Sequence, residues 1–315
     1  MTDNAYSAEV SSGLVALIGQ PNVGKSTLMN AILDVKVAIT TSKPQTTRNR
    51  ILGVQTYPEK GQLCFVDTPG IHKGGDRLNR ALNDTAFRSM QEVDLVAHLV
   101  DAPHLLAWQR KTEDQGMPER ESFISDRLRE RDVPAVLVLN KIDKVNKKVA
   151  LLPLIDVLAE AYDYLDVVPV SAREGENLDT LVDVLLAHLP EQGLLFPAHT
   201  LTDKAERFIA AEYVREQVLE QTEREVPYST AVEVERFRDD ERRGVLEIRA
   251  VIHVEREGQK GIVIGKGGRR IKAIGTAARK ELEAFFGKKV FLETVVRVED
   301  SWTEDPHFMK RFDYE

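Results

Sequence analysis

A glycine-rich run near the N-terminus has the residue types and spacing that bind the phosphates of a nucleotide. It follows the pattern G-x-x-x-x-G-K-S/T and lies between the apolar stretch Leu14–Ile18 and a helical pattern. Glycines let backbone N–H groups turn toward phosphate oxygens, and the N-terminus of the next helix adds partial positive charge. We expect Lys25 to contact the β and γ phosphates and Ser26 to ligate Mg²⁺. The predicted loop residues are Gly19, Gln20, Pro21, Asn22, Val23, Gly24, Lys25, Ser26 and Thr27.

A second motif supplies a carboxylate and a backbone donor. Asp67-Thr68-Pro69-Gly70 directly follows the apolar stretch Leu63–Val66. We expect Asp67 to hold Mg²⁺ through water and the N–H of Gly70 to meet the γ-phosphate.

A threonine-rich loop at 40–48 precedes that strand. A protein that switches on a bound nucleoside triphosphate needs one threonine in this loop to ligate Mg²⁺ and to sense the γ-phosphate. We choose Thr47, which directly precedes Arg48, and Thr46 stays the alternative. The predicted metal ligands are therefore Ser26, Thr47 and Asp67.

Two later motifs predict a guanine base. Asp143 ends the run Asn140-Lys141-Ile142-Asp143, and its carboxylate can accept hydrogen bonds from guanine N1–H and the 2-amino group. Adenine has neither donor and would leave the carboxylate unpaired. In Ser171-Ala172-Arg173, the N–H of Ala172 could bind guanine O6. Both motifs follow apolar stretches, at the carboxyl ends of strands where open α/β sheets bind ligands. The predicted base-binding residues are Asn140, Lys141, Asp143, Ser171, Ala172 and Arg173.

The second half of the chain carries a local basic surface around another glycine cluster. The chain has a net charge of −8, yet residues 258–280 hold seven basic residues and no acidic one. Within them, Gly265-Lys266-Gly267-Gly268 contains G-x-x-G, a loop that in KH domains clamps about four single-stranded nucleotides. A solvated helix face is the alternative explanation of the charge. The predicted RNA contacts are Ile264, Gly265, Lys266, Gly267, Gly268, Arg269, Lys272 and Arg279.

The elements that must position these motifs form two domains. Over residues 1–190, short continuous apolar runs alternate with helical patterns, which is typical of a doubly wound α/β domain around a parallel sheet. Two prolines and a glycine between positions 189 and 197 indicate a linker, which we place at 191–202.

The second domain is expected over residues 203–315. We expect its first helix to start at Asp203, three residues before Glu206, as in a capping box. Strand patterns at 232–237, 245–254 and 289–298, with helices around the glycine cluster, give the order α-β-β-α-α-β. The tail from Trp302 onward has no predicted place.

The segments GQPNVGKS, QTTR, DTPG, NKID and SA, followed by IGKGGRRIKAIGTAARKEL, resemble the Era family of bacterial GTPases over nearly the whole chain. The resemblance implies a P-loop GTPase domain joined to a C-terminal type II KH domain, with GTP or GDP and Mg²⁺ as cofactors. It implies that the protein binds 16S ribosomal RNA near its 3′ end and acts on the 30S ribosomal subunit or its precursor during maturation. It also implies partial contact with the inner membrane, and we expect a monomer. The polar stretch 108–122 is longer than expected for this family.

The segment after Gly70 lacks the glutamine that orients the attacking water in GTPases such as Ras. Ile71 occupies that position and cannot hydrogen-bond, and His72, an expected exposed loop residue, follows it. Related GTPases with an asparagine in the phosphate loop use K⁺ beside the β and γ phosphates, so the resemblance implies this role for Asn22. Hydrogen bonding of Asn22 within the loop is the alternative. The expected contributors to hydrolysis are Lys25, Thr47, Gly70 and Asn22.

The composition of the 315 residues excludes several classes of protein. Cys64 is the only cysteine, which rules out an internal disulfide framework and a cysteine-based zinc site. Apolar runs of six or seven residues are far shorter than the ~20 that cross a bilayer, and the N-terminus lacks a secretory pattern. We therefore expect a cytoplasmic protein. One other function stays open, a non-catalytic RNA-binding module whose nucleotide is structural. The KH pattern and the absence of apolar spans disfavour a third, a GTPase of membrane or metal transport.

Overall fold

The computed structural model describes residues 10–71, 77–112, 117–312 and 314, so His72 lies outside the described residues. The chain divides into two compact units. The first comprises residues 1–37, 47–75 and 82–203, and the second comprises 38–46, 76–81 and 204–315. The second unit thus takes in two short segments from the N-terminal half of the chain.

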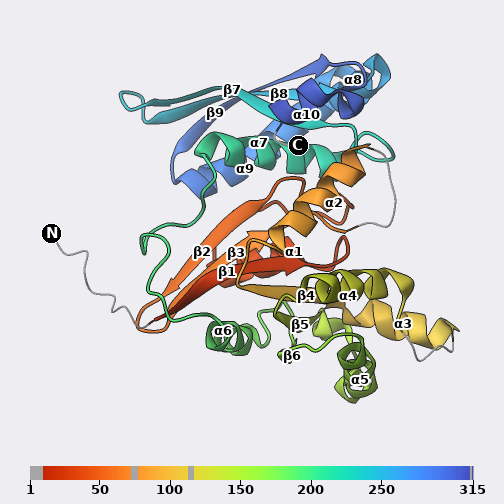
Figure 1. Ribbon diagram of the computed structural model, residues 1–315. Coiled ribbons are helices and arrows are strands. Elements are labelled where there is room, and N and C mark those ends of the chain that lie inside the picture. The colour runs from red at the N-terminus through yellow and green to blue at the C-terminus, as the bar shows by residue number, and fades with distance from the viewer. Residues whose placement is uncertain (1–9, 72–76, 113–116, 313, 315) are drawn as a thin grey trace. The chain divides into compact units, whose positions relative to one another are not determined.

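The first unit is built on a six-stranded sheet with the order β2-β3-β1-β4-β5-β6 (Figure 1). Its strands are β1 (Ser11–Ile18), β2 (Ile51–Tyr57), β3 (Gly61–Asp67), β4 (Leu95–Asp101), β5 (Ala135–Asn140) and β6 (Asp166–Pro169). The edge strand β2 runs antiparallel to β3, and the other neighbours pair in parallel. β2 was not predicted from the sequence, because Gly53 interrupts its apolar residues and its second half contains Gln55 and Thr56.

Helices cover both faces of this sheet. They are α1 (Lys25–Leu33), α2 (Arg77–Ser89), α3 (Ala102–Thr112), α4 (Glu119–Arg131), α5 (Leu151–Ala161) and α6 (Leu178–Ala187). Every residue of β3 and β5 is buried, which requires packing on both sides of the strands. The predicted doubly wound α/β fold is therefore confirmed. The polar stretch 108–122 supplies the end of α3 and the start of α4.

The stretch expected to link the domains packs along the first unit. The carbonyl of Leu201 accepts a hydrogen bond from Val54 N at 2.8 Å. The helix expected at Asp203 is wrong in its start and its cap. Helix α7 (Glu206–Gln221) has Ala205 at its N-cap and no side-chain cap, while Asp203 Oδ1 accepts from Leu52 N at 3.3 Å. A partner about 150 residues away in sequence thus takes the carboxylate that a local capping box would have used.

The second unit follows the predicted order α-β-β-α-α-β. After α7 come β7 (Ala231–Asp240), β8 (Val245–Val254), α8 (Glu257–Ile264), α9 (Arg269–Phe286) and β9 (Lys289–Val298). β8 is the central strand, antiparallel to β7 and parallel to β9. Across the described ranges, we find no helix with the length and apolar character to cross a membrane.

Helix α7 also holds the segment 38–46 within the second unit. Thr40 N donates to Glu216 Oε1 at 2.8 Å, and the buried guanidinium of Arg215 donates to the carbonyl of Thr46. Arg215 also pairs with Glu212 at 2.7 Å. Burial alone would lower the pKa of Arg215, but the Glu212 carboxylate raises it above its ordinary value. The arginine therefore stays charged in the interior, where a lone cation would be costly.

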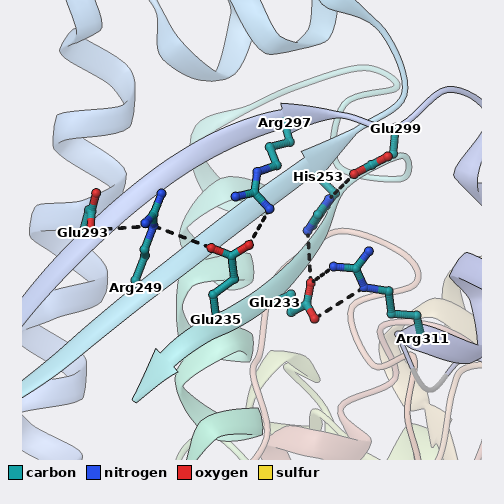
Figure 2. A network of polar contacts seen from close by, with 8 residues as sticks. All are labelled: Glu233, Glu235, Arg249, His253, Glu293, Arg297, Glu299 and Arg311. Carbon is teal, nitrogen blue, oxygen red and sulfur yellow. Dashed lines mark hydrogen bonds and ion pairs between the residues drawn. The ribbon is translucent and has the colours of Figure 1, made fainter. Parts of the chain in front are cut away.

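The C-terminal tail docks on the same unit. A 3₁₀ turn at Trp302–Glu304 and α10 (Pro306–Arg311) place the Trp302 ring in full burial, with Nε1 donating to Ser229 O at 2.9 Å. Figure 2 shows a charged network of the same unit, in which the fully buried His253 lies between Glu233 and Glu299. Burial holds the pKa of His253 below its ordinary value, although Glu233 opposes the shift. Arg311 pairs with Glu233 at 2.5 Å and ties α10 to β7.

Candidate nucleotide site and nucleic-acid interface

The glycine-rich loop joins β1 to α1 through backbone that only glycine tolerates at two points. Gly24 has φ of 105°, and a Cβ there would run into Asn140 Nδ2. A Cβ on Gly19 would run into the carbonyl of Leu99. These contacts explain why both positions are glycine, because the loop is packed closely against neighbouring strand ends.

Lys25 lies inside this loop and is only 6% exposed. Its Nζ donates to the carbonyls of Gly19 and Gln20, each at 3.1 Å. Burial lowers the pKa of Lys25 to about 8, against the raising effect of Asp67 and Glu121. A phosphate group would offer the buried ammonium a full negative charge in place of two neutral carbonyls.

Three oxygen-bearing side chains predicted as metal ligands converge at the start of α1. Ser26 Oγ lies 2.5 Å from Asp67 Oδ2 and 2.8 Å from Thr47 Oγ1. The second oxygen of Asp67 is buried and has no hydrogen-bond partner among the described residues. Burial raises the pKa of this carboxyl, against the hydrogen bond from Ser26 and the charge of Lys25. A hard, oxygen-preferring cation such as Mg²⁺ fits this donor set.

Of the two alternative threonines, the structure brings Thr47 and not Thr46 to this cluster. Thr47 Oγ1 donates to Asp67 Oδ2 at 3.3 Å. Thr46 Oγ1 instead bonds Thr41 and the carbonyl of Lys43, each at 2.7 Å.

The base-binding motifs surround a cavity of about 120 Å³ beside the phosphate loop. Asn140 ties its walls together, because Nδ2 donates to Val23 O at 2.8 Å and Oδ1 accepts from Ala172 N at 3.0 Å. The Ala172 N–H expected to face guanine O6 is thus engaged by Asn140. Asp143 Oδ1 accepts from Ser171 Oγ at 2.7 Å, and the side chain borders the cavity. Arg173 lines it with an exposed side chain.

Two residues were not predicted from the sequence: one lines this cavity, and the other contacts Lys141, which lines it. Lys144 lines the cavity directly after the Asn140–Asp143 motif. Asp101 ends β4 and accepts from Lys141 Nζ at 2.6 Å, and the same ammonium donates to Asn22 O at 2.6 Å. An aspartate at the end of an apolar strand pattern was the signal available for Asp101.

The segment after Asp67 offers no side-chain catalyst within the described residues. Ile71 is buried in the core between the sheet and its helices, and its N–H donates to Gly19 O at 3.2 Å. At Gly70, a Cβ would lie 2.7 Å from Pro21 Cα, so the motif presses closely on the phosphate loop. The predicted inability of Ile71 to act on water agrees with its place in the core.

The second glycine cluster is open where the first is crowded. Gly265, Gly267 and Gly268 have φ of 71°, 61° and 73°, and added Cβ atoms at the latter two would meet nothing within 4 Å. Ile264 is half-buried before the loop, Ile274 is fully buried, and Ile271 packs against the same core. Four exposed basic side chains lie in the loop and along α9: Lys266, Arg269, Lys272 and Arg279.

Comparisons with known proteins match both halves of the chain. Residues 14–141 match the 50S ribosome-binding GTPase family, and residues 225–303 match the KH domain family. The protein named GTPase Era from Stenotrophomonas maltophilia is 47% identical over 304 residues, which cover 96% of this chain and 97% of the relative. GTPase Era from Geobacter metallireducens is 46% identical over 314 residues and the full length of both chains.

Two solved structures are similar over 97% of this chain, each with a TM-score of 0.90 and 39% identity. One is Era in complex with MgGDPNP and nucleotides 1506–1542 of 16S ribosomal RNA, and 99% of that chain is covered. The other is a variant of Aquifex aeolicus Era bound to GDP and AlF4⁻, again with 99% covered.

Proposed function

The chain belongs to the Era family of GTPases, and on that premise we propose that it couples GTP hydrolysis to binding of 16S ribosomal RNA near its 3′ end during maturation of the 30S subunit. The observation that carries the proposal is the pairing, in one chain, of a built nucleotide pocket and an open basic G-x-x-G loop. The similar Era structure that holds MgGDPNP and nucleotides 1506–1542 supports both ligands.

In the nucleotide site, Lys25 contacts the β and γ phosphates, and Asp143 accepts hydrogen bonds from guanine. Ser26, Thr47 and Asp67 would hold Mg²⁺, which neutralises phosphate charge when bound. The unpartnered, buried oxygen of Asp67 supports this assignment. The close approach of Gly70 to Pro21 in the loop supports a contact between the Gly70 N–H and the γ-phosphate.

Hydrolysis in this proposal relies on charge and backbone donors rather than on a general base. Ile71 is in the core, so it cannot orient water. Lys25, Thr47 and Gly70 stabilise and position the γ-phosphate, and Asn22 helps to bind K⁺ at the phosphates. Asn22 has φ of 62°, a left-handed conformation that asparagine tolerates better than most residues.

The RNA face comprises the G-x-x-G loop and the exposed cations after it. The open space above Gly267 and Gly268 lets a ribose-phosphate backbone approach the main chain. Ile264, Gly265, Lys266, Arg269, Lys272 and Arg279 complete this face. The 30S subunit or its precursor is the proposed partner. A monomeric state and peripheral inner-membrane contact are further proposals, testable by sedimentation and by flotation with anionic liposomes.

The test measures steady-state GTP turnover with and without an RNA carrying the 3′ end of 16S ribosomal RNA, together with binding of that RNA. A double change of Gly267 and Gly268 to Asp should abolish RNA binding and leave GTP affinity within about twofold, because added negative charge repels phosphates. An RNA affinity unchanged by this double substitution would refute the KH assignment. RNA binding without GTP turnover would favour the alternative of a non-catalytic module with a structural nucleotide.

A further inference from the structure

A buried acidic side chain outside every recognised motif contacts the phosphate loop. Glu121 lies in the first turn of α4 and is 2% exposed. Its Oε1 accepts a hydrogen bond from Gln20 Nε2 at 2.6 Å, across 101 positions of sequence. Its Oε2 is buried and makes no hydrogen bond within the described part of the chain. The contact joins helix α4 to the second residue of the phosphate loop.

Gln20 is thereby held at both ends. Its side chain is bound by Glu121, and its backbone carbonyl accepts from Lys25 Nζ at 3.1 Å. Glu121 therefore fixes the side chain of the same residue whose carbonyl binds the Lys25 ammonium. Because the loop binds phosphates through backbone N–H groups, its conformation determines how well they converge.

Two further buried groups stand behind the carboxylate. His98 on β4 is fully buried, and its Nε2 faces Glu121 Oε2 at 3.6 Å. Its Nδ1 lies 2.6 Å from the hydroxyl of Tyr164. Burial raises the pKa of Tyr164 above its ordinary value, so the hydroxyl keeps its proton and can donate to Nδ1. The 3.6 Å between His98 Nε2 and Glu121 Oε2 is too long for a hydrogen bond, so among the described residues Gln20 alone hydrogen-bonds the Glu121 carboxylate.

A carboxylate placed here needs a reason, because burial of a charge costs free energy that an apolar side chain would avoid. The N-terminal turn of α4 offsets part of that cost through its partial positive charge. We propose that Glu121 is a positioning residue for the nucleotide site, which holds Gln20 and keeps the phosphate loop in its binding conformation before the nucleotide arrives. The proposal rests on the nucleotide site proposed above, and it extends that site to a residue that touches no part of the ligand.

The first test measures the affinity of fluorescent GDP and GTP analogues in Mg²⁺ for three variants. Glu121→Ala and Gln20→Ala should each weaken affinity by about tenfold, the loss expected for one hydrogen bond to a charged group. Glu121→Gln keeps an oxygen acceptor toward Gln20, so it should stay within about threefold of the parent. A loss in Glu121→Gln as large as in Glu121→Ala would overturn the positioning role.

The second test is a double-mutant cycle between the two residues. If Glu121 acts through Gln20, the double variant should bind no more than about twofold more weakly than either single variant, because the same contact is lost each time. Effects that multiply to about a hundredfold would show that the two residues act independently and would overturn the proposal. A merely structural role of Glu121 would not produce this non-additivity.

Glu130→Ala is the matched control on the same helix, because Glu130 is exposed and pairs only with Arg127 and Arg131 in the described residues. It should leave affinity unchanged. Should Glu121→Ala fail to fold, Gln20→Ala alone remains decisive, and unchanged affinity in that loop variant would overturn the proposal. Lys25→Ala distinguishes failure of the proposed nucleotide site from failure of the positioning role of Glu121. If Lys25→Ala leaves nucleotide affinity intact, the nucleotide site itself is misplaced. If it weakens binding and the Glu121 and Gln20 variants do not, only the positioning role fails.

Discussion

The two glycine loops of this protein precede helices in the same way but are built on opposite principles. The loop before α1 is crowded, internally hydrogen-bonded and wrapped around a buried lysine. The loop before α9 has open space at Gly267 and Gly268 and an exposed lysine. A small ligand with fixed shape is best bound by a site organised in advance, whereas a flexible polyanion is held by accessible backbone and mobile charge.

Gly24→Ala should produce the largest effect, because the new Cβ meets Asn140 and the left-handed φ strains the backbone. We expect GTP affinity to fall by about 100-fold or more. Gly267→Ala is the matched change in the open loop, where only about 1 kcal/mol of backbone strain applies. It should leave GTP affinity unchanged. Nucleotide titration of both variants checks this. Similar losses of GTP affinity in the two variants would contradict the contrast between the crowded and the open loop.

Asp143→Asn should exchange base preference in the crowded site. The new amide places a donor toward the guanine amino group and suits the C2 oxygen of xanthine. We expect the ratio of GTP to xanthosine triphosphate affinity to fall by about 100-fold or more, as for sites built on specific pairing. Competition binding of the two nucleotides measures it. A preserved preference for GTP would remove Asp143 from the base site.

Replacing Na⁺ by K⁺ at matched ionic strength should raise GTP turnover by about tenfold, less than the roughly 10²–10³ that a single oxyanion-hole donor contributes. Asn22→Ala should abolish the difference between the two salts. Rates are measured at saturating GTP and Mg²⁺, with Ile71→Ala as a comparison that should matter far less than loss of a catalytic glutamine. Equal rates in both salts would eliminate the cation mechanism.

Lys266→Ala should have the smallest effect and should be confined to the open loop. Loss of one phosphate contact on single-stranded RNA should reduce the slope of log affinity against log salt by about 0.7. GTP affinity should not change, because Lys266 lies outside the first unit. Filter binding at several salt concentrations gives the slope, and an unaltered slope would place the RNA backbone elsewhere.

Local chemistry made the motifs of both loops predictable from the amino-acid sequence. The motifs could be recognised from their glycine spacing and from the buried strand pattern before each nucleotide motif. Their convergence followed from the general rule that parallel strand ends meet at one edge of the sheet, with no knowledge of distant partners. The same holds for the α-β-β-α-α-β order, since each element carries its own hydrophobic period.

Only the tertiary structure decided the contacts between residues far apart in sequence. Asp203 accepts a hydrogen bond from Leu52 N instead of capping α7, and Arg215 donates to the carbonyl of Thr46. The buried Trp302 fixes the tail, whose place could not be predicted. In the sequence, Glu121 is one charged residue in a polar stretch, and only the folded structure shows that it accepts a hydrogen bond from Gln20. Such pairings depend on how helices and strands pack in three dimensions, and no residue pattern within a single element encodes that packing.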